Sequence, residues 1–93
     1  MALNRDEIQT ALRVKRIVSE YFSNNPSINS IQAKELMPQF IKNGVFQSNH
    51  RDGLPIRDLL RLLDRENQLN LIPQVHFEQK DKNKNWYFIN TNK

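Results

Sequence analysis

The stretch "GLPIRDLLRLLDRE", residues 53–66, carries three arginines spaced four residues apart: Arg57, Arg61 and Arg65. On an α-helix this spacing gathers them along one edge, opposite a side of leucines and an isoleucine. A planar guanidinium can bind the two acceptors of guanine or clamp a phosphate, and the spacing does not distinguish these roles. The row therefore predicts a surface for a nucleic acid. A merely solvated helix face is the simpler interpretation, and it needs no partner.

A second basic cluster follows in "KDKNKN", residues 80–85, with lysines at Lys80, Lys82 and Lys84. On a polar connection between two strands these side chains would contact a phosphate backbone. Lysine at a hairpin tip also serves solubility and protects exposed strand edges. The two clusters together favour nucleic-acid binding if the fold brings them to one face.

Side chains suited to catalysis or metal binding are sparse. His50 and Asp52 in "NHRDG" suggest acid–base chemistry or a metal, but a metal needs several converging ligands and the other histidine, His76, lies on an expected strand. Arg51 between them is expected to reach a phosphate. Without cysteine and with only two glycines, the chain has no thiol site, P-loop or dinucleotide-binding turn. We expect no enzyme, no cofactor, no metal and no small-molecule substrate.

The bulk properties agree with a small basic domain. Ninety-three residues predict one domain over 1–93, and the net charge of +4 favours a polyanionic partner. No apolar run approaches the roughly 20 residues that span a bilayer. The N-terminus "MALNRDEIQT" lacks the apolar stretch of a secretory signal, so we expect a soluble cytoplasmic protein without membrane contact.

The apolar spacing predicts three helical segments. The first runs over 5–22, with Asn4 and Glu7 as a capping pair. The second covers 33–41, with Asn29 or Ser30 as its cap and Gly44 as its stop, and Pro38 predicts a kink or break rather than a straight helix. After a loop over 45–54, the third begins near Pro55 and carries an apolar stripe of Ile56, Leu59, Leu60 and Leu63.

A β-hairpin is predicted at the C-terminus. "QVHFEQ", residues 74–79, alternates in polarity, and "WYFIN", residues 86–90, is rich in aromatic and β-branched residues. Either Trp86 with Phe88, or Tyr87 with Ile89, must pack on the helices, because successive side chains of a strand point to opposite faces. A short extended piece around Ile28 is expected before the second helix.

This order resembles the winged helix-turn-helix superfamily, with small bacterial or phage members of unassigned function as the nearest pattern. The resemblance rests on "SIQAKELMPQFI" as second helix, "GLPIRDLLRLLDREN" as recognition helix and "VHFEQKDKNKNWYFI" as wing. It implies an α+β, mainly α fold of three helices and a C-terminal wing. It also implies that the third helix enters the major groove of DNA. The loop over 45–54 departs from the short turn that family members usually have there.

The resulting functional expectation is a small DNA-binding protein, either a transcriptional regulator or an accessory factor of a mobile element. Its partner would be double-stranded DNA, with RNA not separable by sequence and a homodimer left open. The alternative is a winged-helix protein–protein interaction or dimerisation module without nucleic-acid binding. The expected DNA contacts are Arg57, Arg61, Arg65, Arg51, Lys80, Lys82 and Lys84.

Overall fold

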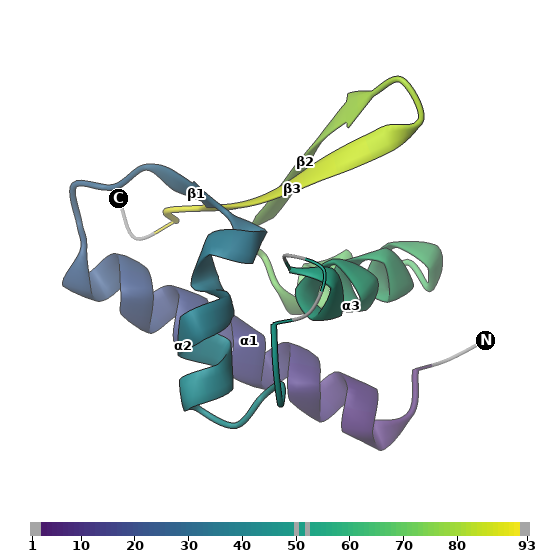
Figure 1. Cartoon of the computed structure of the whole chain (residues 1–93), viewed down its shortest axis with the longest axis horizontal. Helices are drawn as coiled ribbons and strands as arrows, with labels where there is room; N and C mark the ends of the chain where they lie inside the picture. Colours follow the sequence, from purple (N-terminus) through teal and green to yellow (C-terminus); the bar gives the residue numbers. More distant parts are fainter. Residues whose placement is uncertain (1–2, 50, 52, 92–93) are drawn as a thin grey trace.

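The computed structural model describes residues 3–49, 51 and 53–91. Within this part, three α-helices and two short 3-10 helices accompany a three-stranded antiparallel sheet (Figure 1). The predicted α+β, mainly helical class is thus confirmed at this level. In chain order the elements are α1 (Arg5–Asn24), β1 (Ser30–Gln32), η1 (Ala33–Leu36), α2 (Met37–Lys42), α3 (Leu54–Arg65), η2 (Leu69–Leu71), β2 (Val75–Lys80) and β3 (Asn83–Ile89).

Helix α1 begins as the sequence predicts. The Asn4 side chain accepts a hydrogen bond from the Glu7 backbone N–H at 2.8 Å, and the Glu7 carboxylate accepts from the Asn4 N–H at 2.9 Å. Both bonds satisfy donors that a helix start otherwise leaves unpaired. The helix continues two residues beyond the expected end at Phe22.

The second helical segment is broken, as Pro38 predicts. A 3-10 helix, η1, ends at Leu36, and α2 starts at Met37 with Pro38 in its first turn, where the missing amide hydrogen costs least. The predicted cap at Asn29 or Ser30 is wrong. Ser30 lies in β1, because its segment pairs with β3, and neither η1 nor α2 has a side-chain cap.

Helix α3 starts against η1. Gly53 is its N-cap, with a left-handed φ of +94° that an L side chain rarely adopts. A Cβ added to Gly53 would lie 2.5 Å from the Lys34 Cβ, so the backbone of Gly53 packs directly on η1. The predicted stripe of Ile56, Leu59, Leu60 and Leu63 is buried along α3. Glycine at this position therefore permits both the turn and the close contact.

The sheet has the order β1-β3-β2, so the C-terminal strand is central. The hairpin connection is shorter than predicted: Lys80 pairs with Asn83, so "KDKNKN" is mostly strand and only Asp81 and Lys82 form the turn. Asp81 has a φ of +50°, which suits a tight two-residue turn. Lys84 consequently lies within β3 and not at the tip.

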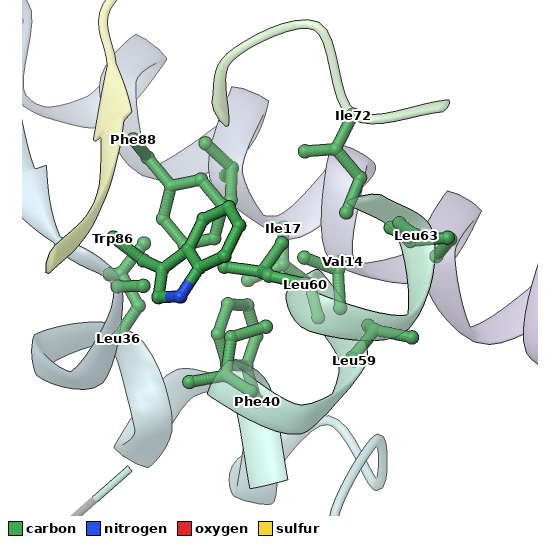
Figure 2. Packing of buried hydrophobic residues seen from close by; sticks show 14 of the residues in the cluster. Val14, Ile17, Leu36, Phe40, Leu59, Leu60, Leu63, Ile72, Trp86 and Phe88 are labelled. Carbon is green, nitrogen blue, oxygen red and sulfur yellow. The ribbon is translucent and has the colours of Figure 1, made fainter. Parts of the chain in front are cut away.

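The core lies between the helices and the inner face of the sheet (Figure 2). On β3, Trp86 and Phe88 are buried. The rings of Phe88 and Phe40 pack edge to face, with their centres 6.2 Å apart. Tyr87 and Ile89 occupy the opposite face. The packing fixes β3 against η1, α2 and α3 and thereby fixes the hairpin relative to α3. The labelled core residues in the figure are Val14, Ile17, Leu36, Phe40, Leu59, Leu60, Leu63, Ile72, Trp86 and Phe88.

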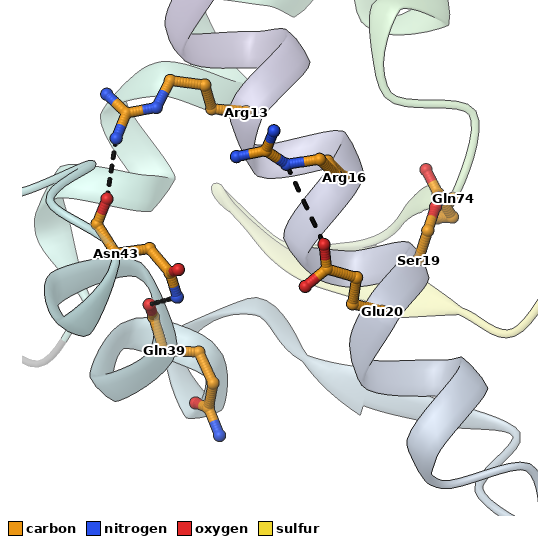
Figure 3. Close-up of polar contacts among 7 residues, drawn as sticks. All are labelled: Arg13, Arg16, Ser19, Glu20, Gln39, Asn43 and Gln74. Carbon is orange, nitrogen blue, oxygen red and sulfur yellow. Dashed lines mark hydrogen bonds and ion pairs between the residues drawn. The ribbon is translucent and has the colours of Figure 1, made fainter.

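Hydrogen bonds of polar side chains also hold α1 to the segments packed against it (Figure 3). Arg13 donates to the Asn43 carbonyl at the end of α2, at 2.7 Å. The buried Gln74, just before β2, donates to the Ser19 hydroxyl, also at 2.7 Å. These bonds anchor both the loop after α2 and the entry to the hairpin on α1.

Candidate nucleic-acid interface

The arginine row of α3 divides into two kinds of residue. Arg61 and Arg65 point outward, with side chains 54% and 72% exposed, and each has a nearby carboxylate: Asp58 at 3.4 Å from Arg61 and Glu66 at 3.7 Å from Arg65. Arg61 and Asp58 are both exposed, and Arg65 is exposed although Glu66 is only 16% exposed, so both ion pairs are weak and easily exchanged. Both guanidinium groups can therefore turn toward an incoming anion.

Arg57 is held more firmly. Its Nη2 donates to the Arg51 carbonyl at 2.8 Å, and its Nε donates to the Gly53 carbonyl at 3.4 Å. The side chain is half-buried and fastens the loop before α3. Its charge is fixed in position, and part of its hydrogen-bonding capacity serves the fold. Arg51 itself is exposed, with a left-handed φ of +53°.

Lys84 links the hairpin to α3. Its Nζ pairs with the Asp64 carboxylate and lies 4.5 Å from the centre of the Phe77 ring and 5.7 Å from that of Trp86. The side chain is 32% exposed. Cations are attracted to aromatic faces, so three partners hold this ammonium group between strand and helix. Lys84 is thus a half-buried connection, unlike the freely exposed tip lysine that its spacing suggested.

The other two lysines of the cluster are exposed. Lys80 ends β2, and Lys82 lies in the turn. Lys82 shares a hollow of about 270 Å³ with the outward arginines of α3. This hairpin hollow is lined by Arg61, Asp64, Arg65, Gln79, Lys82, Lys84 and Trp86.

A second hollow of about 190 Å³ adjoins the first, because Lys84 and Trp86 line both. This η1 hollow is lined by Gln32, Ala33, Lys34, Arg57, Lys84, Asn85 and Trp86. We call the six cations of the two hollows the basic face: Lys34, Arg57, Arg61, Arg65, Lys82 and Lys84. The fold therefore brings together five of the seven predicted contact residues, while Arg51 and Lys80 line neither hollow.

Lys34 is the member of the basic face that sequence reasoning missed. It belongs to η1, and it reaches the face because η1 packs under Gly53 at the start of α3. In the sequence, Lys34 is marked only as a charged residue next to Ala33, which belongs to the predicted apolar side of the second helix. Which segment packs beneath the third helix cannot be read from spacing, so that signal is too weak to identify the residue.

Of the three residues that suggested catalysis or a metal, the structure describes only His76. His50 and Asp52 lie outside the described residues, and His76 is exposed on β2. Among residues 3–49, 51 and 53–91, no group of three or more His, Asp or Glu side chains could hold a metal ion. The described helices include none with the length and apolar character needed to cross a membrane.

No family model, no curated protein and no solved structure matches this chain. The basic face therefore has to be interpreted from its own geometry and charge.

Proposed function

We propose that the chain is a winged helix-turn-helix-like domain that binds double-stranded DNA through its basic face. The element order of helix, strand, helix, helix and hairpin supports this, as does the sheet order β1-β3-β2. In this proposal α3 is the recognition helix, which the major groove can admit, and the β2–β3 hairpin is the wing.

One observation carries the proposal: cations from η1, α3 and the hairpin line two adjoining hollows. These residues are separated by up to 50 positions in sequence, from Lys34 to Lys84, yet they share one surface. Pairing with Asp64 accounts for the position of Lys84, but a solvated helix face gives no reason for Lys82 of the distant hairpin to lie beside Arg61 and Arg65. A polyanion gives that reason, because each phosphate neutralised releases a condensed counterion.

The contacts divide by how each side chain is held. Arg61 and Arg65 are exposed along the outward edge of α3 and would meet bases or phosphates. Lys82, in the hairpin turn, would contact the backbone beside the groove. Arg57 is held by backbone carbonyls and would contribute fixed positive charge, whereas Asp64 balances much of the charge of Lys84. By analogy with the superfamily, the domain would act as a transcriptional regulator or a mobile-element accessory factor.

The test is equilibrium binding to a pool of short labelled duplexes at low salt. A face variant combines Arg61→Gln, Arg65→Gln and Lys82→Gln. A control variant combines Lys15→Gln, Arg16→Gln and Lys42→Gln, which are exposed on α1 and α2 and line neither hollow. Both variants lose three positive charges. We expect the face variant to lose at least about tenfold in affinity and the control much less. Equal losses would refute a localised DNA surface.

An interaction module without nucleic-acid binding is the second candidate, and one observation favours it. A broad, mainly apolar hollow of about 670 Å³ lies beside β2, lined by Leu69, Asn70, Ile72, Pro73, Val75, His76 and Phe77. Phe77 is 37% exposed there. Binding by apolar contact is far less sensitive to salt than binding to phosphate, so the two candidates predict different salt responses.

A further inference from the structure

The η1 hollow differs from the hairpin hollow in the balance of its charges. Three cations line it, Lys34, Arg57 and Lys84, and no carboxylate is among its described lining residues. Asp64, which pairs with Lys84, lines the hairpin hollow instead. Asp64 balances much of the Lys84 charge from outside this hollow. Among the described lining residues of the η1 hollow, cationic side chains still outnumber carboxylates.

The positions of two of these charges are fixed before any ligand arrives. Carbonyls of Arg51 and Gly53 hold the Arg57 guanidinium, and Asp64 with the Phe77 ring holds the Lys84 ammonium. Charges fixed in this way need little ordering when an anion binds. Lys34 is fixed at its base by the contact of its Cα and Cβ with Gly53.

The wall also includes amide groups and a buried indole. Gln32 and Asn85 bring side-chain amides from two neighbouring strands. The Nε1 of Trp86 is buried and has no hydrogen-bond partner among the described residues. Trp86 is 4% exposed and lines the hollow, so its indole can report whether the hollow is occupied.

We propose that the η1 hollow binds one phosphate group of an oxyanion. Its volume of about 190 Å³ is below the lower limit of about 300 Å³ for pockets that hold drug-sized ligands, which suits a small anion. The oxyanion would be either a phosphodiester of bound DNA or a free phosphate group. The first source rests on the proposed function. The second is independent of it.

Trp86 makes the proposal directly testable. It is the only tryptophan of the chain, so its indole N–H gives one assignable signal in an ¹H–¹⁵N correlation spectrum. We would titrate the labelled protein with pyrophosphate at constant ionic strength, adjusted with chloride. The expected result is a saturable shift of the indole signal. The absence of such a shift would overturn the proposal.

Variants of Lys34 distinguish binding in the η1 hollow from a general effect of the net charge of the protein on anion binding. Lys34→Gln retains the Cβ that packs at Gly53 and should weaken pyrophosphate binding at least about fivefold, whereas Lys34→Arg should restore it. Lys42→Gln removes one charge from the exposed end of α2 and should leave binding unchanged. The remaining amide signals report whether each variant is folded. Equal weakening by Lys34→Gln and Lys42→Gln would overturn the proposal.

A further titration, with a short DNA duplex, distinguishes the two sources of the phosphate group, which are a phosphodiester of DNA and free phosphate. If the duplex produces the same indole shift as pyrophosphate, a phosphodiester occupies the hollow. If pyrophosphate binds but the duplex does not, the hollow takes free phosphate and the proposed DNA-binding function fails alone. If the duplex binds without affecting the indole and pyrophosphate produces no shift, the oxyanion site fails alone.

Discussion

Lys84 of β3 pairs through its ammonium group with the carboxylate of Asp64 on α3, and the same ammonium lies 4.5 Å from the centre of the Phe77 ring. This contact joins the hairpin to the helix that would enter the DNA groove. It therefore sets the distance between the α3 residues and the hairpin residues of the basic face. Lys84 thus has a structural role.

Replacing Lys84 by methionine keeps most of the apolar stem but removes the charge. We expect the free energy of unfolding to fall by about 1 kcal/mol, because a partly exposed ion pair and a cation–π contact are each worth about 0.5 kcal/mol. Urea denaturation measures the change. Lys80→Met, at the exposed end of β2, is the control and should cost less than about 0.5 kcal/mol. Equal costs would contradict the structural role of Lys84.

Replacing Asp64 by asparagine removes the carboxylate of the hairpin hollow. If the basic face binds DNA, duplex affinity should rise about threefold, equivalent to about 0.6 kcal/mol, since a repelling charge is removed and Lys84 is released. The matched control is Glu20→Gln, which removes a carboxylate from the exposed side of α1 (Figure 3). A similar rise in both variants would mean that only net charge matters.

The two glycines of the chain should tolerate alanine very differently. At Gly53 an added Cβ would meet the Lys34 Cβ at 2.5 Å, and φ is +94°. At Gly44, where φ is +75°, the nearest atom, on Arg13, is 3.7 Å away. We expect Gly44→Ala to cost about 1 kcal/mol from backbone strain and Gly53→Ala at least about 3 kcal/mol. Chemical denaturation of both variants checks this, and similar costs would contradict the close packing of α3 on η1.

The apolar stripe of α3 should carry much of the stability. Leu60 is fully buried, whereas Leu12 on α1 is 41% exposed. Leu60→Ala should lower the free energy of unfolding by about 2–5 kcal/mol, through reduced burial and the cavity that remains. Leu12→Ala should change it by less than about 1 kcal/mol. Thermal or urea unfolding distinguishes them, and a small effect at Leu60 would contradict the inward orientation of the stripe.

The elements of the fold that depend on local pattern could be predicted from the sequence. The cap at Asn4, the break at Pro38 and the buried face of α3 follow from spacing and backbone chemistry within a few residues. The cap predicted at Ser30 was wrong because pairing with β3, nearly 60 residues later, makes that segment a strand. The length of the hairpin connection was likewise decided by strand pairing, which reaches Lys80 and Asn83.

The candidate site was predictable only in part. The row of Arg57, Arg61 and Arg65 is visible from helical spacing alone. The exposure of Arg61 and Arg65 follows from the buried leucines opposite, but the half-buried position of Arg57 does not. The convergence with Lys34 and the engagement of Lys84 were not visible, because both depend on contacts between distant segments. Charge spacing along a chain identifies candidates, and tertiary packing decides which of them are available.

The salt dependence of duplex binding tests the central claim most directly. Affinity would be measured over a series of salt concentrations for the native chain, the face variant at Arg61, Arg65 and Lys82, and the control variant on α1 and α2. Phosphate binding makes log K fall linearly with log salt, and removing one phosphate-binding cation reduces the slope by about one. We predict a steep slope for the native chain, one shallower by about three for the face variant, and an unchanged slope for the control. A flat native slope, or identical slopes for all three proteins, would contradict DNA binding through the basic face.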